Sequence, residues 1–164
     1  MEPTVLFRDF EERDIDFVCQ CKNDEKLNSM IVGKWHPYTR DEAKKWVYGC
    51  MGEHDAYKFW AICTNDEEKR IVGWVGISEI DKFKKSAHFY SQVIGDPKYR
   101  SGLPWIEIQQ FILNFVFEKL CLYVLQAAES ISLAHTISNP ACSKPKSMPP
   151  IPANKLPTFN LSIT

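Results

Sequence analysis

Residues 94–107, IGDPKYRSGLPWIE, have an order of residue types that often binds a phosphate group. An apolar strand pattern ends at Gly95, and a turn, a basic residue and a single glycine lead into a helical pattern. Backbone N–H groups at the start of a helix, together with the helix dipole, attract anions. A connection between a strand and a helix that binds nothing has the same residue types. The local sequence leaves both alternatives open.

The cysteine residues, in contrast, do not predict a metal site. They lie at positions 19, 21, 50, 63, 121 and 142, and no second pair at zinc-site spacing accompanies Cys19 and Cys21. Cys63 and Cys121 lie in apolar runs, where a thiol behaves as a small hydrophobic side chain. We therefore expect buried, reduced thiols and no bound metal.

Hydrophobic periodicity predicts the elements that would position residues 94–107. Strands are expected at 5–10, 58–64, 71–80, 86–95 and 121–126, and helices at 15–22, 25–31, 39–51 and 105–120. Short turns between 58 and 95 predict an antiparallel meander. The mixed order predicts an α/β (or α+β) fold, with a mixed, mostly antiparallel central sheet flanked by helices.

Two of these helices begin with capping residues. Thr39 and Glu42 form a capping box, and Asp14 is of the type that caps a helix starting at Ile15. The helix at 105–120 is so rich in apolar residues that we expect it to be buried over much of its surface.

The composition of the chain excludes several classes of protein. The 164 residues suffice for one domain with a core, and 25% of them are charged. A net charge of −1 argues against a nucleic-acid partner. No apolar run reaches the roughly 20 residues of a membrane helix, and the N-terminal residues lack a signal-peptide pattern. We therefore expect a cytoplasmic protein with no membrane partner.

Four segments give a more specific signal. They are LFRDFEERDIDFVCQCKNDE, TRDEAKKWV, FWAICTNDEEKRIVGWVGISEID and SAHFYSQVIGDPKYRSGLPWIE. They resemble the GNAT superfamily of N-acetyltransferases, in the branch that includes the ribosomal-protein N-terminal acetyltransferases, and the resemblance covers about residues 4–126. The resemblance implies a GNAT-like fold, acetyl-CoA as co-substrate, and transfer of an acetyl group to a primary amine of a small molecule or a protein N-terminus.

The resemblance also implies which residues bind acetyl-CoA. Val93 and Ile94 would face the pantetheine arm, and the phosphate loop would comprise Arg100, Ser101, Gly102, Leu103, Pro104 and Trp105. This loop departs from the family's glycine-rich pattern, because Gly102 is its only glycine and Pro104 has no N–H to donate.

Acetyl transfer to an amine requires a base, and the strand at 86–95 has no carboxylate. By alternation His88 and Tyr90 share one strand face with Gln92, and His88 has a suitable intrinsic pKa for a base. Glu79 and Asp81 are second candidates. A half-exposed strand histidine and a solvated turn are the alternatives. We predict the catalytic residues His88, Tyr90 and Glu79.

Aromatic residues suggest where the acceptor binds. Trp35 and Tyr38 lie in a loop where family members place substrate-binding residues, although both could instead hold that loop against the core. Trp46, Trp60 and Trp74 fall at apolar positions of their elements and are expected in the core.

The composition changes at Ala127, where prolines and serines become frequent. We expect a partial GNAT-like domain at 1–126 and an atypical Pro/Ser-rich segment at 127–164. The family's C-terminal tyrosine has no counterpart in that segment. An alternative is therefore a catalytically inactive, truncated or frame-shifted relative, acting as a CoA-binding or interaction module. Missing closing strands would expose an apolar face that a homodimer would cover.

Overall fold

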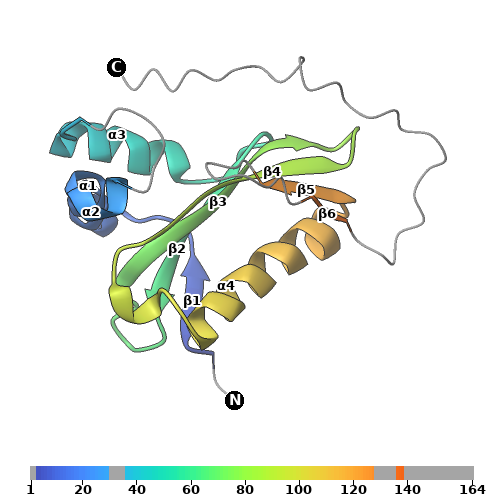
Figure 1. Ribbon diagram of the computed structural model, residues 1–164. Coiled ribbons are helices and arrows are strands. Elements are labelled where there is room, and N and C mark those ends of the chain that lie inside the picture. Colours follow the sequence, from blue (N-terminus) through green and yellow to red (C-terminus); the bar gives the residue numbers. More distant parts are fainter. Residues whose placement is uncertain (1–2, 30–35, 128–135, 139–164) are drawn as a thin grey trace.

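A six-stranded sheet in the order β1-β2-β3-β4-β5-β6 forms the centre of the protein in a computed structural model (Figure 1). The structure describes residues 3–29, 36–127 and 136–138. Its strands are β1 (Val5–Arg8), β2 (Lys58–Thr64), β3 (Ile71–Asp81), β4 (Ser86–Ile94), β5 (Val124–Ala127) and β6 (Thr136–Ser138). Its α-helices are α1 (Ile15–Asn23), α2 (Glu25–Asn28), α3 (Arg40–Cys50) and α4 (Leu103–Asn114).

The strand pairing confirms a mixed, mostly antiparallel sheet. Strands β1 to β4 form an antiparallel series, in which short turns predicted the part from β2 to β4, and β5 and β6 are also antiparallel to each other. Among the strands that the structure describes, only β4 and β5 pair in parallel, and α4 connects them. This is the crossover that a parallel pair requires.

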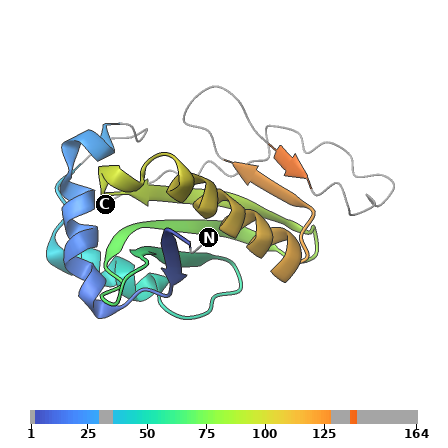
Figure 2. The same cartoon turned by 90° about the horizontal axis from the view of Figure 1, so that it is seen from below.

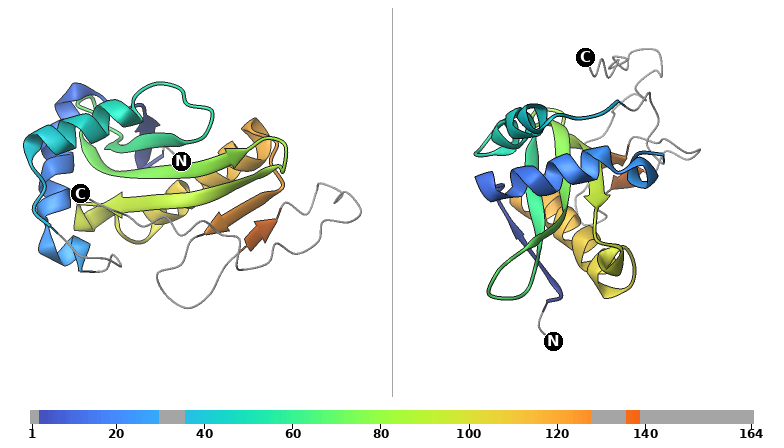
Figure 3. Two further views of the ribbon diagram at one scale, coloured as in Figure 1. Left: turned by 90° about the horizontal axis from the view of Figure 1, so that it is seen from above. Right: turned by 90° about the vertical axis from the view of Figure 1, so that its left-hand side faces the viewer.

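Helices cover both faces of the sheet and divide the core into two layers (Figures 1 and 3). Helix α4 packs Ile108 and Ile112 against one face, and Val116, just after the end of α4, packs on the same face. Helices α1 and α3 pack Val18 and Val47 against the opposite face. In Figure 2, which views the molecule from below, α4 lies in front of the sheet. No helix among the described residues is both long and apolar enough to cross a bilayer.

The capping box at the start of α3 is present. The hydroxyl of Thr39 accepts a hydrogen bond from the Glu42 N–H at 3.2 Å, and the Glu42 carboxylate accepts one from the Thr39 N–H at 2.7 Å. These bonds satisfy two N–H groups at the helix start and lower the pKa of Glu42. The local sequence therefore determines where α3 begins.

Asp14 has a different role from the predicted N-cap. It precedes α1, but its side chain makes no cap hydrogen bond and is fully buried. Its carboxylate accepts two hydrogen bonds from the Arg8 guanidinium, at 2.7 and 2.8 Å, and one from the Glu11 N–H at 2.8 Å. Asp14 thus joins the end of β1 to the start of α1.

The predicted helix at 105–120 is partly wrong in extent and burial. Helix α4 begins at Leu103, and its regular part ends at Asn114, where a π-helical turn (Phe115–Lys119) continues the chain. Trp105 and Ile106 are 45% and 50% exposed, so only one side of the helix is buried. Strand β5 begins at Val124 rather than 121, and Cys121 is exposed rather than buried.

Candidate active site

The second half of β4 presents a free edge. The parallel pairing with β5 covers Ser86 to Phe89, and among the described residues Ser91 to Ile94 pair only with β3. Along an edge strand, alternate N–H and C=O groups point away from the sheet without a backbone partner. This edge can therefore form hydrogen bonds to an extended ligand that carries amides.

A β-bulge at Tyr90 marks where this free edge begins. Gly76 pairs with Ser91 and Ile77 pairs with Phe89, so Tyr90 is an extra residue without a partner on β3. A bulge of this kind disturbs the alternation of side chains. Tyr90 lies on the face covered by α3, where its ring contacts Phe59 at a centroid distance of 5.8 Å.

The bulge corrects one expectation from alternation. Gln92 does not share a face with His88 and Tyr90, because the extra residue reverses the pattern after position 90. Its side-chain oxygen accepts a hydrogen bond from Gln109 of α4 at 2.8 Å. Val93 instead packs on the layer that includes Trp74, and Ile94 is buried in the layer of α4.

The loop before α4 presents several free N–H groups. Gly102 is the N-cap residue and has φ +71°, a conformation in which glycine avoids the strain of a Cβ atom. No described residue accepts a hydrogen bond from the N–H of Ser101, Gly102, Leu103 or Trp105. Pro104 in the first turn has no N–H, as its residue type dictates. The remaining donors and the helix dipole could attract an anion, with one N–H fewer than a first turn without proline.

The side chain of Arg100 holds this loop against the end of β4. It donates to the carbonyl oxygens of Ile94 at 2.9 Å and Gly95 at 2.8 Å. Gly95 in turn donates its N–H to Val72 at 2.9 Å. The free edge of β4 and the start of α4 are therefore connected by direct bonds, so that one ligand could contact both.

The predicted catalytic residues His88 and Glu79 lie near each other. The His88 Nε2 atom is 3.8 Å from a carboxylate oxygen of Glu79. Glu79 lies at a second irregularity, between Ser78 and Asp81 of β3, and has φ +50°. A residue with a Cβ atom is strained in this conformation, and such strain is often found at functional positions.

Asp81 has a structural role instead. Its carboxylate accepts hydrogen bonds from the N–H groups of Phe83 and Lys84 at 3.0 and 2.8 Å, which lowers its pKa. These bonds stabilise the turn between β3 and β4. The Asp81 carboxylate is therefore engaged in the turn, whereas the Glu79 carboxylate lies near His88.

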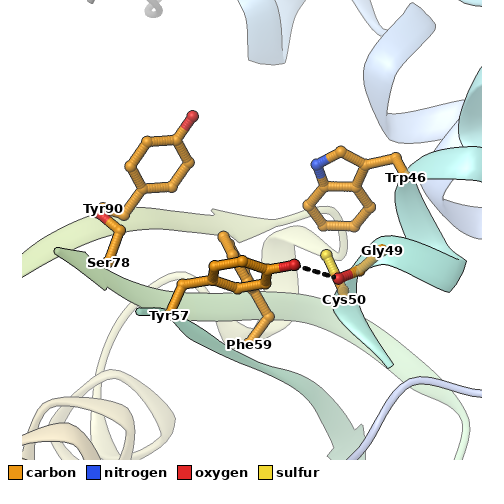
Figure 4. A pocket seen from close by; sticks show the side chains of 7 residues that line it. All are labelled: Trp46, Gly49, Cys50, Tyr57, Phe59, Ser78 and Tyr90. Carbon is orange, nitrogen blue, oxygen red and sulfur yellow. Dashed lines mark hydrogen bonds between the residues drawn. The ribbon is translucent and has the colours of Figure 1, made fainter. Parts of the chain in front are cut away.

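A cavity of about 320 Å³ opens beside the bulge on the α3 face, where Figure 4 shows Trp46 and Tyr90 on opposite sides with Tyr57 and Phe59 between them. Its walls are formed by Trp46, Gly49, Cys50, Tyr57, Phe59, Ser78 and Tyr90. The Tyr57 hydroxyl donates to the Gly49 carbonyl at 3.0 Å, so this wall is fixed. Ser78 pairs with His88 across the strands, which places His88 beside the cavity.

Tyr38 lies near this cavity, and Trp35 is outside the described residues. The Nζ atom of Lys22 lies 5.5 Å from the ring centre of Tyr38, 5.2 Å from Trp46 and 5.8 Å from Trp74. Burial lowers the pKa of Lys22.

Trp74 and Trp60 are core residues as predicted, whereas Trp46 is half-buried and lines the cavity.

Sequence reasoning missed the cavity residues Tyr57, Ser78 and Gly49. They come from a loop, a strand and a helix, so no spacing along the chain connects them. The signal that could have identified them is the sheet register, because Ser78 lies opposite His88. Among the described residues, no three His, Cys, Asp or Glu side chains are placed to hold a metal ion.

The sequence from 4 to 144 matches the family model described as an acetyltransferase (GNAT) domain. The chain therefore belongs to the GNAT acetyltransferases. The matched residues extend past 126, where we expected the domain to end. None of the curated proteins searched matches the sequence.

Two solved structures illustrate the fold similarity. One is spermidine N-acetyltransferase from Vibrio cholerae in complex with CoA and spermine, with TM-score 0.62, 19% identity, and 76% of this chain and 70% of that chain covered. Another is a GNAT-family acetyltransferase from Bacillus anthracis, with TM-score 0.62, 20% identity, and coverage of 77% and 70%. At these identities the similarity extends to the fold and not to the substrate.

Proposed function

We propose that the protein is an acetyl-CoA-dependent N-acetyltransferase that transfers an acetyl group to a primary amine of a small molecule or a protein N-terminus. The observation that supports this most strongly is the continuous path from the free edge of β4 to the first turn of α4. Pantetheine has amides that suit a strand edge, and the pyrophosphate suits free N–H groups at a helix start. Family membership supports acetyl-CoA as the ligand of this path.

In this proposal Val93 and Ile94 provide backbone groups for the pantetheine arm. Ser101, Gly102, Leu103 and Trp105 donate N–H groups to the pyrophosphate, and Arg100 fixes the loop. The thioester would then lie near the bulge at Tyr90, because the arm runs back along β4 from the helix start. The cavity with Trp46 and Tyr90 opens at the same place and would receive the acceptor, with Tyr38 at its side.

The chemistry follows from the groups beside the cavity. His88 removes a proton from the acceptor ammonium, and Glu79 at 3.8 Å stabilises the imidazolium that forms. The free amine attacks the thioester carbonyl, so that a C–N bond forms and the C–S bond breaks. The hydroxyl of Tyr90 donates a proton to the departing CoA thiolate, and the resulting phenolate takes the second proton that the nitrogen loses as the amide forms. Orientation of the two reactants on one strand contributes to the rate as well.

Thiol release from acetyl-CoA in the presence of a panel of primary amines tests this function. We expect turnover with at least one amine, and we expect His88→Ala to lower kcat by about 100-fold without weakening acetyl-CoA binding. Glu67→Gln in the exposed turn before β3 serves as a control, with unchanged kcat. Equal kcat for His88→Ala and the unmodified chain would exclude His88 as the base.

The alternative is a module that binds CoA without turnover. Pro104 favours it, since this residue removes one donor from the phosphate loop. A folded chain that binds acetyl-CoA but releases no thiol with any amine would support the alternative. The division into a domain at 1–126 and a distinct segment at 127–164 also remains a proposal, and activity of a chain ending at 126 would support it.

A further inference from the structure

The cavity beside Tyr90 has walls without a formal charge. Aromatic rings form most of its lining, and the hydroxyl of Ser78 and the thiol of Cys50 add neutral polar groups. Burial raises the pKa of the Cys50 thiol to about 12, so it stays protonated at neutral pH. A volume of about 320 Å³ lies at the lower end of the range for small-molecule sites. The space therefore suits a compact, apolar group.

A cation of the protein itself lies beside this cavity. The Lys22 Nζ atom is 5.2 Å from the ring centre of Trp46, which also forms a wall of the cavity. An aromatic face that holds one ammonium is a poor site for a second, because the two positive charges repel each other. An acidic side chain near this cavity, Glu79, is 3.8 Å from His88. The Lys22 ammonium thus disfavours a further ammonium group against the ring of Trp46.

We propose that this cavity binds an uncharged aromatic or branched aliphatic group that is attached to the acceptor's primary amine, and that a polyamine is a poor acceptor. This inference rests on the proposed N-acetyltransferase function, because it identifies the acceptor class of the same site. The reacting nitrogen would lie at the mouth, near Tyr90 and His88, while the apolar group packs against the rings of Trp46 and Phe59, which line the cavity. The proposed acceptor differs from spermine, a polyamine that the Vibrio cholerae spermidine N-acetyltransferase binds.

Gly49 offers a variant that adds bulk at the cavity wall without removing a core side chain. A Cβ atom at Gly49 would meet no atom within 4 Å, and the residue lies in the last turn of α3 with no positive φ. Gly49→Leu adds a bulky group at the wall and is compatible with a helix. Gly49→Ala adds one methyl group at the same position and is the matched control.

The test is calorimetric titration of the folded chain, in the presence of CoA, with 2-phenylethylamine, spermidine and propylamine. A tripeptide with N-terminal Phe and its counterpart with N-terminal Gly separate a peptide acceptor from a free amine. We expect 2-phenylethylamine or the Phe peptide to bind at least about tenfold more tightly than spermidine. Gly49→Leu should reduce that ratio by about tenfold, and Gly49→Ala should reduce it less.

Titration with acetyl-CoA in the same preparation separates the two proposals. Tighter binding of spermidine than of 2-phenylethylamine and the Phe peptide would overturn the inference, as would an unchanged ratio in Gly49→Leu. The proposed function would stand in either case if acetyl-CoA binds and an amine is acetylated. Binding of 2-phenylethylamine by a chain that does not bind acetyl-CoA would instead support the cavity and contradict the acetyltransferase. If no amine binds, the inference is wrong.

Discussion

The guanidinium of Arg100 donates a hydrogen bond from Nε to the carbonyl oxygen of Ile94 at 2.9 Å. The same guanidinium donates a second hydrogen bond, from Nη2 to the Gly95 carbonyl oxygen at 2.8 Å. The side chain therefore connects the last residue of β4 to the loop that starts α4. In the proposed complex, these two regions hold the pantetheine arm and the pyrophosphate, so Arg100 determines their spacing.

Replacing Arg100 should loosen the phosphate loop. We expect Arg100→Met to weaken acetyl-CoA binding by about tenfold, because a hydrogen bond that involves a charged group makes a net contribution of about 1.5–3 kcal/mol. Calorimetric titration measures the change in Kd. Lys98→Met removes one positive charge from the same segment, where Lys98 is exposed, without removing the bonds to Ile94 and Gly95. An equal loss in both variants would show that charge alone is responsible.

Pro104 is expected to limit affinity for the pyrophosphate. Pro104→Ala restores an N–H in the first turn of α4, beside the free N–H groups of Leu103 and Trp105. Acetyl-CoA should then bind about fivefold more tightly, equivalent to about 1 kcal/mol. Pro97→Ala, in the short 3₁₀ turn Pro97–Tyr99, is the control and should leave Kd unchanged. Unchanged or weaker binding by Pro104→Ala would contradict an anion site at this helix start.

Breaking the Arg8–Asp14 pair should destabilise the fold. Asp14→Asn leaves the guanidinium of Arg8, whose side chain is 16% exposed, without a charged partner of good geometry. We expect a loss of about 3 kcal/mol in the free energy of unfolding, measured by urea denaturation. Asp16→Asn removes an ion pair with Arg40 whose side chains are 75% and 62% exposed, and should not shift the midpoint. Similar midpoints for both variants would contradict a structural role for Asp14.

The buried thiols should make the fold less stable at high pH. Burial raises the pKa of Cys21 and Cys63 to about 11 and that of Cys50 to about 12, from 9.0. Unfolded thiols lose protons near pH 9.0, whereas the folded ones keep them, so stability is complete below pH 9 and falls as pH rises toward about 11. Urea midpoints between pH 8 and 10 measure this decline.

Alanine variants identify the source of that decline. Replacing Cys21, Cys50 and Cys63 together should reduce the slope of the midpoint against pH, because these are the buried thiols in the described part of the chain. The exposed Cys121 provides the control, since Cys121→Ala should keep the original slope. A slope that is the same in all three proteins would assign the decline to other groups.

Local sequence patterns predicted those parts of the fold that depend on neighbouring residues. The capping box of Thr39 and Glu42 located the start of α3, and short turns predicted the meander from β2 to β4. Asp14 has the correct residue type for an N-cap, but a partner six positions earlier, Arg8, occupies its carboxylate. Only the position of Arg8 at the end of β1, within hydrogen-bond distance of Asp14, decides between these two roles.

The site was predictable to a smaller extent, because it depends on register and not on spacing. His88 and Glu79 were predicted from residue type, and the structure places them 3.8 Å apart. The extra residue at Tyr90 could not be predicted from alternation, and it moves Gln92 to the opposite face. The exposure of Trp105 in α4 was also unexpected, since its apolar character matches that of the buried Ile108 and Ile112.

Calorimetric titration of the folded chain with acetyl-CoA tests the central claim most directly, with dephospho-CoA as the comparison. We predict saturable binding of one acetyl-CoA per chain, weakened in Arg100→Met and strengthened in Pro104→Ala. This result would establish that the edge of β4 and the start of α4 form one binding site. A folded chain that shows no saturable binding would mean that residues 94–107 only connect a strand to a helix.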